Sequence, residues 1–350
     1  MTFKLLNSLK RHLRLNNKII RLNNFFDKIQ TKDPFVIFID LNSFAPNFNY
    51  VEYLLYGKYI SKNKNLFIVV LPKNDFVDAS KKENKDFFSS FRVKTILKPL
   101  IEIIIGNDAT IIFAKNRNEV KEFFELNSEN KLPRNANFND INFTAIWVKD
   151  LYKLMLKDKS PLKILKNHNN ISALKNLFLK DFNSKKIITI SVKFNSYKKF
   201  ASSQVEEWKK LGQWLESKNY NVIYLSDVEN FEILSELNKQ QFISVSTICS
   251  YDLEMRNSLY DLAYFNFSIN GGTAQILIHS NNNYIIPKFN NSLSSSIEST
   301  EDIKNTYGID KFEELPFSTN LQKILWDKES ENFEYMKVEF EKLEKIYYKK

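Results

Sequence analysis

Short apolar runs alternate with amphipathic stretches through the first 157 residues of this chain. Such alternation predicts buried strands joined by helices, and therefore an α/β domain with a mainly parallel sheet. The predicted strands are 35–39, 66–71 and 109–114. The predicted helices are 50–59, 82–105, 118–126 and 147–156, and residues 127–146 are predicted to be irregular.

The alternation restarts after residues 158–185, a charged stretch with few strand signals. The predicted strands of the second half are 186–192, 221–225, 265–269 and 284–286. The predicted helices are 204–219, 231–237, 255–263, a short one from 273 and a long one at the C-terminus. The β-branched run 242–248 favours one further strand.

This pattern divides the chain into two domains of similar type. We expect an N-terminal Rossmann-like domain over 1–157, a linker region over 158–185, and a C-terminal Rossmann-like domain over 186–350 that includes the C-terminal helix. The fold class is therefore α/β, with two Rossmann-like domains that face each other across a cleft.

The N-terminal residues 3–28 predict an amphipathic helix with Leu5, Leu9 and Leu13 on one face and basic residues among them. A helix packed on its own domain is the favoured interpretation, and a helix resting on an anionic membrane is the alternative. No apolar run approaches the ~20 residues of a membrane span, and the single cysteine, Cys249, excludes an internal disulfide framework. We expect a cytoplasmic protein, with peripheral contact to the inner membrane through 3–28 as the open alternative.

Lys and Arg together number 51 against 41 Asp and Glu, which gives a net charge of +10. This excess suits an anionic partner such as a nucleotide or a phosphorylated glycan. The basic residues are spread along the chain, so no nucleic acid is expected as a partner, and a nucleic-acid-binding protein is the weakest alternative.

Several kinds of chemistry lack their sequence pattern. The three histidines are scattered, and no His/Cys cluster has the spacing of metal ligands. The chain has no Asp-x-Asp motif, no phosphate loop ending in Lys-Ser/Thr, no dinucleotide fingerprint and no Gly-x-Ser-x-Gly elbow. We therefore expect neither a metal nor a cofactor.

A glycine turn, Asn270-Gly271-Gly272, joins the predicted strand 265–269 to a helix that starts at Thr273. Adjacent glycines let the backbone approach a ligand, and free N–H groups before a helix attract anions. Thr273 is a candidate N-cap. The alternative is a tight turn that binds nothing.

Two further strand ends of the second half carry polar residues. Lys193 follows the strand 186–192, and Ser226 and Asp227 follow the strand 221–225. Lys193 could contact a diphosphate, and Ser226 and Asp227 a ribose or base. The alternatives are an exposed loop lysine and a helix-capping aspartate.

The second half of the chain resembles bacterial GT-B glycosyltransferases from surface-polysaccharide (lipopolysaccharide or capsule) clusters. The resemblance covers roughly 186–330, and its motifs are moderately specific for the fold. It rests on Ile187–Lys193, Val205–Trp208, the strand 221–225 with Asp227, Leu259–Gly272, and the tail with Leu315-Pro-Phe, Asn320-Leu-Gln and Leu325-Trp326. The resemblance implies that Gly271, Gly272 and Thr273, with Asn270 before them, lie at the diphosphate of a nucleotide-sugar donor, with Lys193 beside it.

Two departures from the family pattern occur at Lys193 and Ala201, where similar proteins carry arginine. Lysine does not replace the bidentate fork of arginine at a phosphate. The departures favour the alternative of a catalytically silent GT-B-like scaffold in a glycan-assembly complex.

The function that the sequence favours is a metal-independent glycosyltransferase acting on a surface-glycan or lipid-linked acceptor. An inverting enzyme of this kind needs a carboxylate base for the acceptor hydroxyl. Asp40, at the end of the strand 35–39, is the candidate, with Asp108 in reserve. The alternative for Asp40 is a turn or capping aspartate. Arg117 follows the strand 109–114 at another candidate ligand edge, and its alternative is a solvated charge in the first turn of a helix.

Overall fold

A computed structural model of the chain describes residues 33–42, 46–62, 64–72, 91–106, 109–114, 117–126, 130–134, 136–138, 146–157, 164, 166–177, 185–193, 202–227, 232–289, 301, 304–305, 308–310 and 313–349. The predicted helix over 3–28 lies outside these residues. Contacts divide the chain into two compact units. Unit 1 comprises Met1–Pro46, Gly57–Ser90 and Ile105–Phe143, and unit 2 comprises Asn47–Tyr56, Phe91–Ile104 and Thr144–Lys350.

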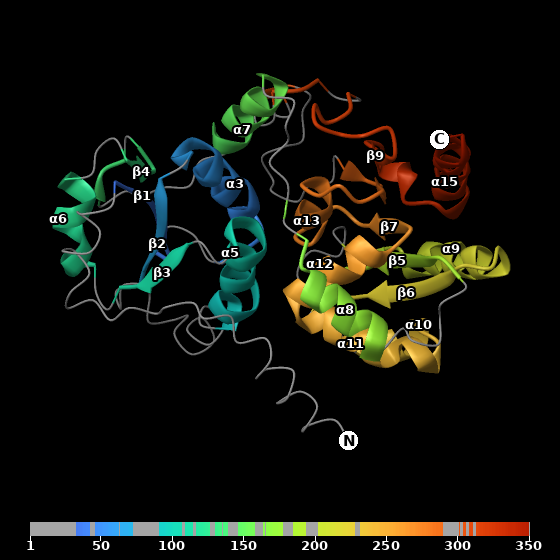
Figure 1. The fold of residues 1–350 in the computed structure, drawn as a ribbon. Coiled ribbons are helices and arrows are strands. Elements are labelled where there is room, and N and C mark those ends of the chain that lie inside the picture. Colours follow the sequence, from blue (N-terminus) through green and yellow to red (C-terminus); the bar gives the residue numbers. More distant parts are fainter. Residues whose placement is uncertain are drawn as a thin grey trace, which may run out of the picture. The chain divides into compact units, whose positions relative to one another are not determined.

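Unit 1 is built on a parallel sheet of strand order β3-β2-β1-β4 (Figure 1). Its strands are β1 (Pro34–Asp40), β2 (Asn65–Leu71), β3 (Thr110–Phe113) and β4 (Lys131–Leu132). Helix α6 (Asn118–Leu126) covers one face, where the ring of Phe124 meets that of Phe38 edge to face at 4.8 Å. The continuous apolar runs of β1 and β2 fit strands that are buried on both faces.

Two helical segments belong partly to each unit. They are α3 (Tyr50–Ser61) and the continuous stretch formed by η3 (Val93–Leu97), a π-helix, and α5 (Lys98–Ile105). Gly57 lets the last part of α3 lie close to β1, because a β-carbon there would overlap the side chain of Ile37.

Unit 2 is built on a second parallel sheet, of strand order β6-β5-β7-β8-β9. Its strands are β5 (Ile187–Ser191), β6 (Asn221–Leu225), β7 (Phe265–Ser268), β8 (Tyr284–Ile286) and β9 (Gln322–Ile324). Its helices are α7 (Ile146–Lys157), α8 (His168–Leu177), α9 (Val205–Ser217), α10 (Glu232–Leu237), η7 (Gln240–Phe242), α11 (Ile243–Tyr251), α12 (Leu253–Leu262), α13 (Ala274–Ile278), η9 (Lys328–Ser330) and α15 (Phe333–Tyr348).

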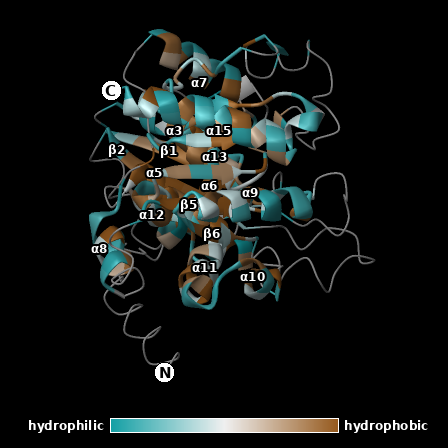
Figure 2. Ribbon diagram, turned by 90° about the vertical axis from the view of Figure 1, so that its right-hand side faces the viewer, coloured by the Kyte–Doolittle hydropathy of each residue, from teal (hydrophilic) through white to brown (hydrophobic). Residues whose placement is uncertain are grey.

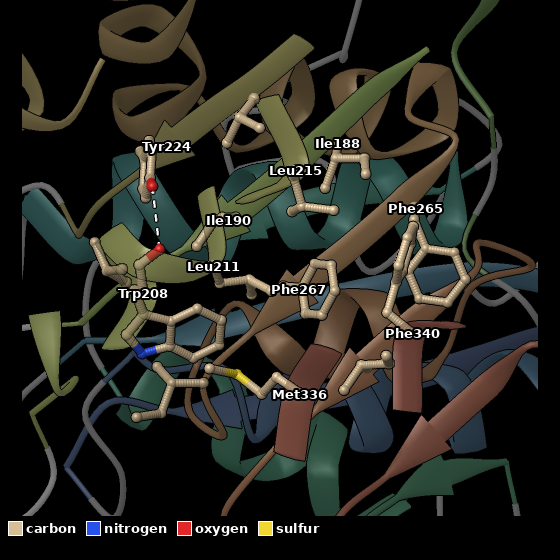
Figure 3. Packing of buried hydrophobic residues seen from close by; sticks show 14 of the residues in the cluster. Ile188, Ile190, Trp208, Leu211, Leu215, Tyr224, Phe265, Phe267, Met336 and Phe340 are labelled. Atoms are coloured by element: carbon tan, nitrogen blue, oxygen red, sulfur yellow. Dashed lines mark hydrogen bonds between the residues drawn. The ribbon is translucent and has the colours of Figure 1, made fainter. Parts of the chain in front are cut away.

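The main core of unit 2 lies between its sheet and the helices α9 and α15 (Figure 3). Trp208 and Phe340 bring these two helices onto Phe267 of β7, and all three side chains are fully buried. The hydroxyl of Tyr224 donates to the carbonyl oxygen of Trp208 at 3.1 Å. On the opposite face of the sheet, Tyr260 of α12 hydrogen-bonds Ser191 of β5 at 2.8 Å.

Hydropathy follows this layering. In Figure 2 strands such as β1 are coloured mostly hydrophobic, whereas α8 is mostly hydrophilic. Both sheets are parallel and helices flank their strands, so the α/β fold class of the prediction is confirmed. The cleft that the two-domain prediction includes stays a prediction.

The structure corrects one predicted strand. Residues 242–248 fall in η7 and α11. Phe242, Val245 and Cys249 are buried at helical spacing, with Ser246 and Ser250 beside them. The packing of this face outweighs the strand preference of the β-branched residues, because β-propensity depends strongly on context.

The structure also contains elements that the sequence pattern did not predict. The strand β4 is only two residues long and lies in the stretch 127–146 that was predicted to be irregular. Helix α8 lies within the predicted linker 158–185 and packs on α12. The boundaries at 157 and 186 stay a prediction, while contacts place Asn47–Tyr56 and Phe91–Ile104 with the second sheet.

Candidate functional site at the carboxyl edge of the second sheet

The register of the second sheet lines up the predicted site residues. Ser191 pairs with Leu225 on one side and with Ser268 on the other. The N–H of Val192 donates to the carbonyl of Leu225 at 2.9 Å, and the pairing therefore continues past the end of β5. When this register is extended by two residues beyond Ser191, Lys193 is level with Asp227 on one side and with Asn270 on the other. Ligands of parallel sheets bind at this carboxyl edge.

Lys193 lies along the glycine turn. A β-carbon built on Gly271 would lie 3.3 Å from both Cδ and Nζ of Lys193. The backbone of Lys193 is fixed by Ser203, whose hydroxyl oxygen accepts from Lys193 N–H at 2.8 Å and whose N–H donates to Lys193 C=O at 2.7 Å. The ammonium group and the turn, which are 78 residues apart in sequence, are thus neighbours in space.

The turn presents backbone donors. The carbonyls of Gly271 and Gly272 accept hydrogen bonds from the N–H groups of residues 274 and 275 at 3.1 and 3.2 Å. The N–H groups of Gly271, Gly272 and Thr273 themselves donate no hydrogen bond within the described part of the chain. Three consecutive N–H groups, on half-buried residues beside an ammonium group, are donors suited to an oxyanion.

Asn270 has a structural role at the start of the turn. Its side-chain amide donates to the carbonyl of Phe289 at 2.6 Å, and it is buried. This bond ties the end of β7 to the segment after β8. Asn270 therefore positions the turn, while its own amide group is engaged.

Gly272 is required for a reason that the sequence does not predict. A β-carbon there would overlap the ring of Phe48, with Cε2 only 2.8 Å away. Neither Gly271 nor Gly272 has a left-handed backbone. The close approach of Phe48, rather than backbone freedom, explains the glycine at 272.

Thr273 occupies the N-cap position of α13, as predicted, but its side chain makes no capping hydrogen bond. Its backbone is already helical, at φ −71° and ψ −20°, which removes the usual capping geometry. Helix α13 is only five residues long, so the candidate anion site depends on the N–H groups and Lys193 rather than on a helix dipole.

Ser226 is buried and fully engaged. Its N–H donates to the hydroxyl of Ser250 at 3.0 Å, and its own hydroxyl donates to the carbonyl of Asp227 at 3.0 Å. Asp227 is half-buried. Helix α10 begins at Glu232, so Asp227 is not the N-cap of that helix.

Glu331 is a residue of this edge that sequence reasoning missed. It is 1% exposed, and its Oε1 accepts from Gln204 N–H and from Trp208 Nε1, both at 2.7 Å. Its Oε2 accepts from Lys288 Nζ at 3.0 Å. Glu331 thus joins the start of α9 to the end of β8. Its partners in α9 lie more than 120 residues away, so no local pattern signals the contact.

Asp40, in unit 1, is held by an arginine. The Nη1 and Nη2 atoms of Arg117 contact the Oδ1 and Oδ2 atoms of Asp40, the latter pair at 2.8 Å. Asp40 is 2% exposed, and its Oδ1 also accepts from Asn42 N–H at 2.9 Å. The bond from Asn42 N–H is the contact that a turn aspartate makes, and this was the non-catalytic alternative for Asp40. Asp108 lies outside the described residues.

Among the described residues, no group of three or more His, Cys, Asp or Glu side chains is placed to hold a metal ion. No helix within the described ranges combines the length and apolar character needed to cross a bilayer.

Comparisons with known proteins give distant structural likenesses. No family model matches the chain, and no curated protein matches it. A glycosyl transferase of family 9 from Veillonella parvula DSM 2008 is similar at 9% identity and a TM-score of 0.44, over 81% of this chain and 93% of that chain.

Two further solved structures are similar. One is the ADP-heptose lipopolysaccharide heptosyltransferase II of E. coli, at 11% identity and a TM-score of 0.37, over 72% of this chain and 84% of that chain. The other is the wall teichoic acid polymerase TagF, at 10% identity and a TM-score of 0.25, over 94% of this chain and 86% of that chain. The candidate site is defined by contacts within this chain.

Proposed function

We propose that this protein is a metal-independent glycosyltransferase that moves a sugar from a nucleotide-sugar donor to a surface-glycan or lipid-linked acceptor. The observation that carries the proposal is the position of Lys193 along Gly271, beside three N–H groups that have no partner within the described residues. This set of donors fits a diphosphate, and the sequence resemblance implies that role for the same residues.

The proposed mechanism uses this set of donors to stabilise the leaving group. As the bond between sugar and diphosphate breaks, negative charge grows on the diphosphate oxygens. The ammonium of Lys193 and the N–H groups of 271–273 meet that charge from fixed positions, which is the most effective form of electrostatic catalysis. Asp227 is proposed for the ribose or base. Ser226 is proposed to support Asp227, because its own polar groups are engaged.

The acceptor base is proposed to be Asp40 if the enzyme inverts, with Asp108 in reserve. Arg117 engages both carboxylate oxygens of Asp40, so this role requires one oxygen to leave the guanidinium group. A retaining enzyme needs no such base, and Asp40 then has only its structural role.

A nucleotide-binding experiment tests the proposal. We expect one of UDP, GDP, dTDP, ADP or CMP to raise the Tm of the wild-type protein, because ligands that bind only the folded state stabilise it. Lys193→Ala removes the ammonium group, and Gly271→Val displaces it, since a side chain there meets Lys193. Both variants should lose the response.

The matched control is Lys210→Ala, which removes an exposed α9 lysine paired only with Glu207 on the same helix. This variant should keep the full nucleotide response. Equal responses in Lys193→Ala and in the control would contradict the proposed site. Sugar release from the matching nucleotide-sugar would then establish the activity.

A second candidate function is a catalytically silent scaffold in a glycan-assembly complex. The observation that favours it is the ring of Phe48 against Gly272, because this ring occupies one side of the turn. If the protein is such a scaffold, no nucleotide should raise the Tm of the folded protein. The Tm of Phe48→Ala, in which the ring no longer covers the turn, should not respond to nucleotides either.

A further inference from the structure

Arg256, on α12, is a buried cation without a carboxylate partner. It is 2% exposed, its Nη2 donates to the carbonyl oxygen of Ser226, and its Nε is buried with no hydrogen-bond partner. No carboxylate of the described residues lies within 4.0 Å of its guanidinium group. A buried guanidinium in this state is costly to the protein, because its charge has no counter-charge and its Nε–H has no acceptor.

Two other cations at strand ends have a carboxylate partner within the chain. Arg117, at the edge of the first sheet, has both nitrogens of its fork on Asp40. Lys288, after β8, pairs with Glu331 at 3.0 Å. The buried Lys131 of β4 has no carboxylate partner either, but its ammonium donates to the carbonyl oxygen of Phe124. Arg256 differs from these cations in that its Nε–H has no acceptor within the described residues.

Arg256 lies at the same sheet edge as the proposed donor site. Its partner Ser226 directly follows β6, and the register places Ser226 beside Val192, next to Lys193. One turn further along α12, Tyr260 bonds Ser191 at 2.8 Å, which fixes the helix against β5. Lys193 follows Ser191 by two residues, just beyond the end of β5.

We propose that Arg256 is the anion-binding residue of an oxyanion subsite at the carboxyl end of β6, and that it binds a phosphate group. The planar fork of a guanidinium matches two phosphate oxygens, and its free Nε–H is one of the donors that such a contact uses. The subsite rests on the proposed function and extends it. Together, Arg256 and Lys193 provide two cations for the diphosphate, and Arg256 supplies the bidentate contact that a lysine cannot.

An anion-binding Arg256 and a purely structural Arg256 should differ in how substitution changes the Tm and the response to pyrophosphate. If Arg256 is held unpaired in order to bind an anion, Arg256→Met removes an uncompensated charge and should not lower the Tm of the ligand-free protein. The same variant should lose the stabilisation that inorganic pyrophosphate gives to the wild type. A structural arginine gives the opposite pair of results, a lower Tm and an unchanged response to pyrophosphate.

The experiment measures Tm and pyrophosphate affinity at constant ionic strength for the wild type, Arg256→Met, Arg256→Lys and Lys288→Met. Arg256→Lys keeps the charge but loses the fork, and should weaken pyrophosphate binding by about tenfold or more. Lys288→Met is the matched control, because it removes a buried cation that does have a carboxylate partner. It should lower the Tm and keep the pyrophosphate response.

Two outcomes overturn the inference. One is a wild-type protein that pyrophosphate does not stabilise, and the other is an unchanged affinity in both Arg256 variants. A second panel with nucleoside diphosphates separates this inference from the proposed function. Binding of pyrophosphate through Arg256 without binding of any nucleotide leaves the subsite in place and removes the glycosyltransferase proposal.

Discussion

The ring of Phe48 lies against the backbone of Gly272, where a side chain at position 272 would have to be. Gly272→Ala should therefore lower the free energy of unfolding by about 1–3 kcal/mol, the usual cost of an added group in a filled space. Urea denaturation measures this change. Gly271→Ala is the matched control and should cost less, because its β-carbon meets the flexible end of Lys193 at 3.3 Å.

A double-mutant cycle shows whether Phe48 is the cause. Gly272→Ala in a Phe48→Ala background should cost clearly less than in the wild type, because the ring is no longer present. Costs that add within about 0.5 kcal/mol would show that the two residues do not interact.

Glu331 should be among the most sensitive positions of the second sheet. Glu331→Gln leaves the buried ammonium of Lys288 without its counter-charge, and loss of one partner of a buried pair costs about 3–5 kcal/mol. The loss should appear in urea denaturation. Adding Lys288→Met to this variant should restore part of the stability, and a purely additive double mutant would contradict the pairing.

The Asp40–Arg117 pair separates a structural from a catalytic role. If Asp40 only holds Arg117, then Asp40→Asn and Arg117→Gln should destabilise unit 1 to a similar degree, since each leaves the other side chain largely buried without its partner. Sugar transfer, measured on the folded fraction, should then persist in both variants. Loss of transfer in Asp40→Asn alone would assign the base to Asp40.

Glu254 should make stability depend on pH. Burial, followed by a hydrogen bond that protonated Glu254 donates to Glu102 and by the nearby charges of Glu102 and Asp252, raises the pKa of Glu254 above its ordinary value of 4.5. The folded protein then keeps a proton that the unfolded chain releases above pH 4.5. This contribution is fully present below that pH and is lost as the pH rises through the raised pKa.

The groups around Glu254 come from three helices. They are Glu102 of α5, Asp252 before α12, and Asn170 of α8. Glu254→Gln should flatten the fall of Tm with rising pH, while Glu236→Gln, at an exposed position of α10, should not. An unchanged slope in Glu254→Gln would show that another group titrates.

His279 and Glu52 form a buried pair that the proposed function does not use. The Nε2 atom of His279 is 3.7 Å from Oε1 of Glu52, and within the described residues neither ring nitrogen has a hydrogen-bond partner. The ring stacks on Phe317 at 5.3 Å. Replacing both polar groups, as in His279→Phe with Glu52→Leu, should be neutral or stabilising, by about 1 kcal/mol. Urea denaturation that shows a large loss would reveal a satisfied polar contact.

Elements with a strong local pattern were predicted closely from the sequence. The observed bounds of α6, β6 and β8 are those predicted, because their apolar positions and flanking turn residues mark both ends. The pattern failed at α11, where β-branched residues lie in a helix whose buried face decides the structure. It also failed at β4, which is too short to carry any periodicity.

The same distinction holds for the candidate site. Lys193, Asp227 and Asn270 were predictable, because the carboxyl ends of parallel strands meet at one edge. Phe48, Arg256 and Glu331 were not, because each acts through a contact between segments far apart in the sequence. Their roles depend on what lies opposite each side chain, and one sequence does not contain that information.

The order of segments in the two units has a consequence for how the chain matures on the ribosome. The second sheet forms from residues after 186, yet its unit also includes Asn47–Tyr56 and Phe91–Ile104, which are synthesised much earlier. Its core also needs Met336, Phe340 and Leu343 of α15. These early segments, Phe48 among them, must therefore wait through most of translation before their neighbours exist. A fragment that begins at residue 186 therefore lacks the early segments of its own unit.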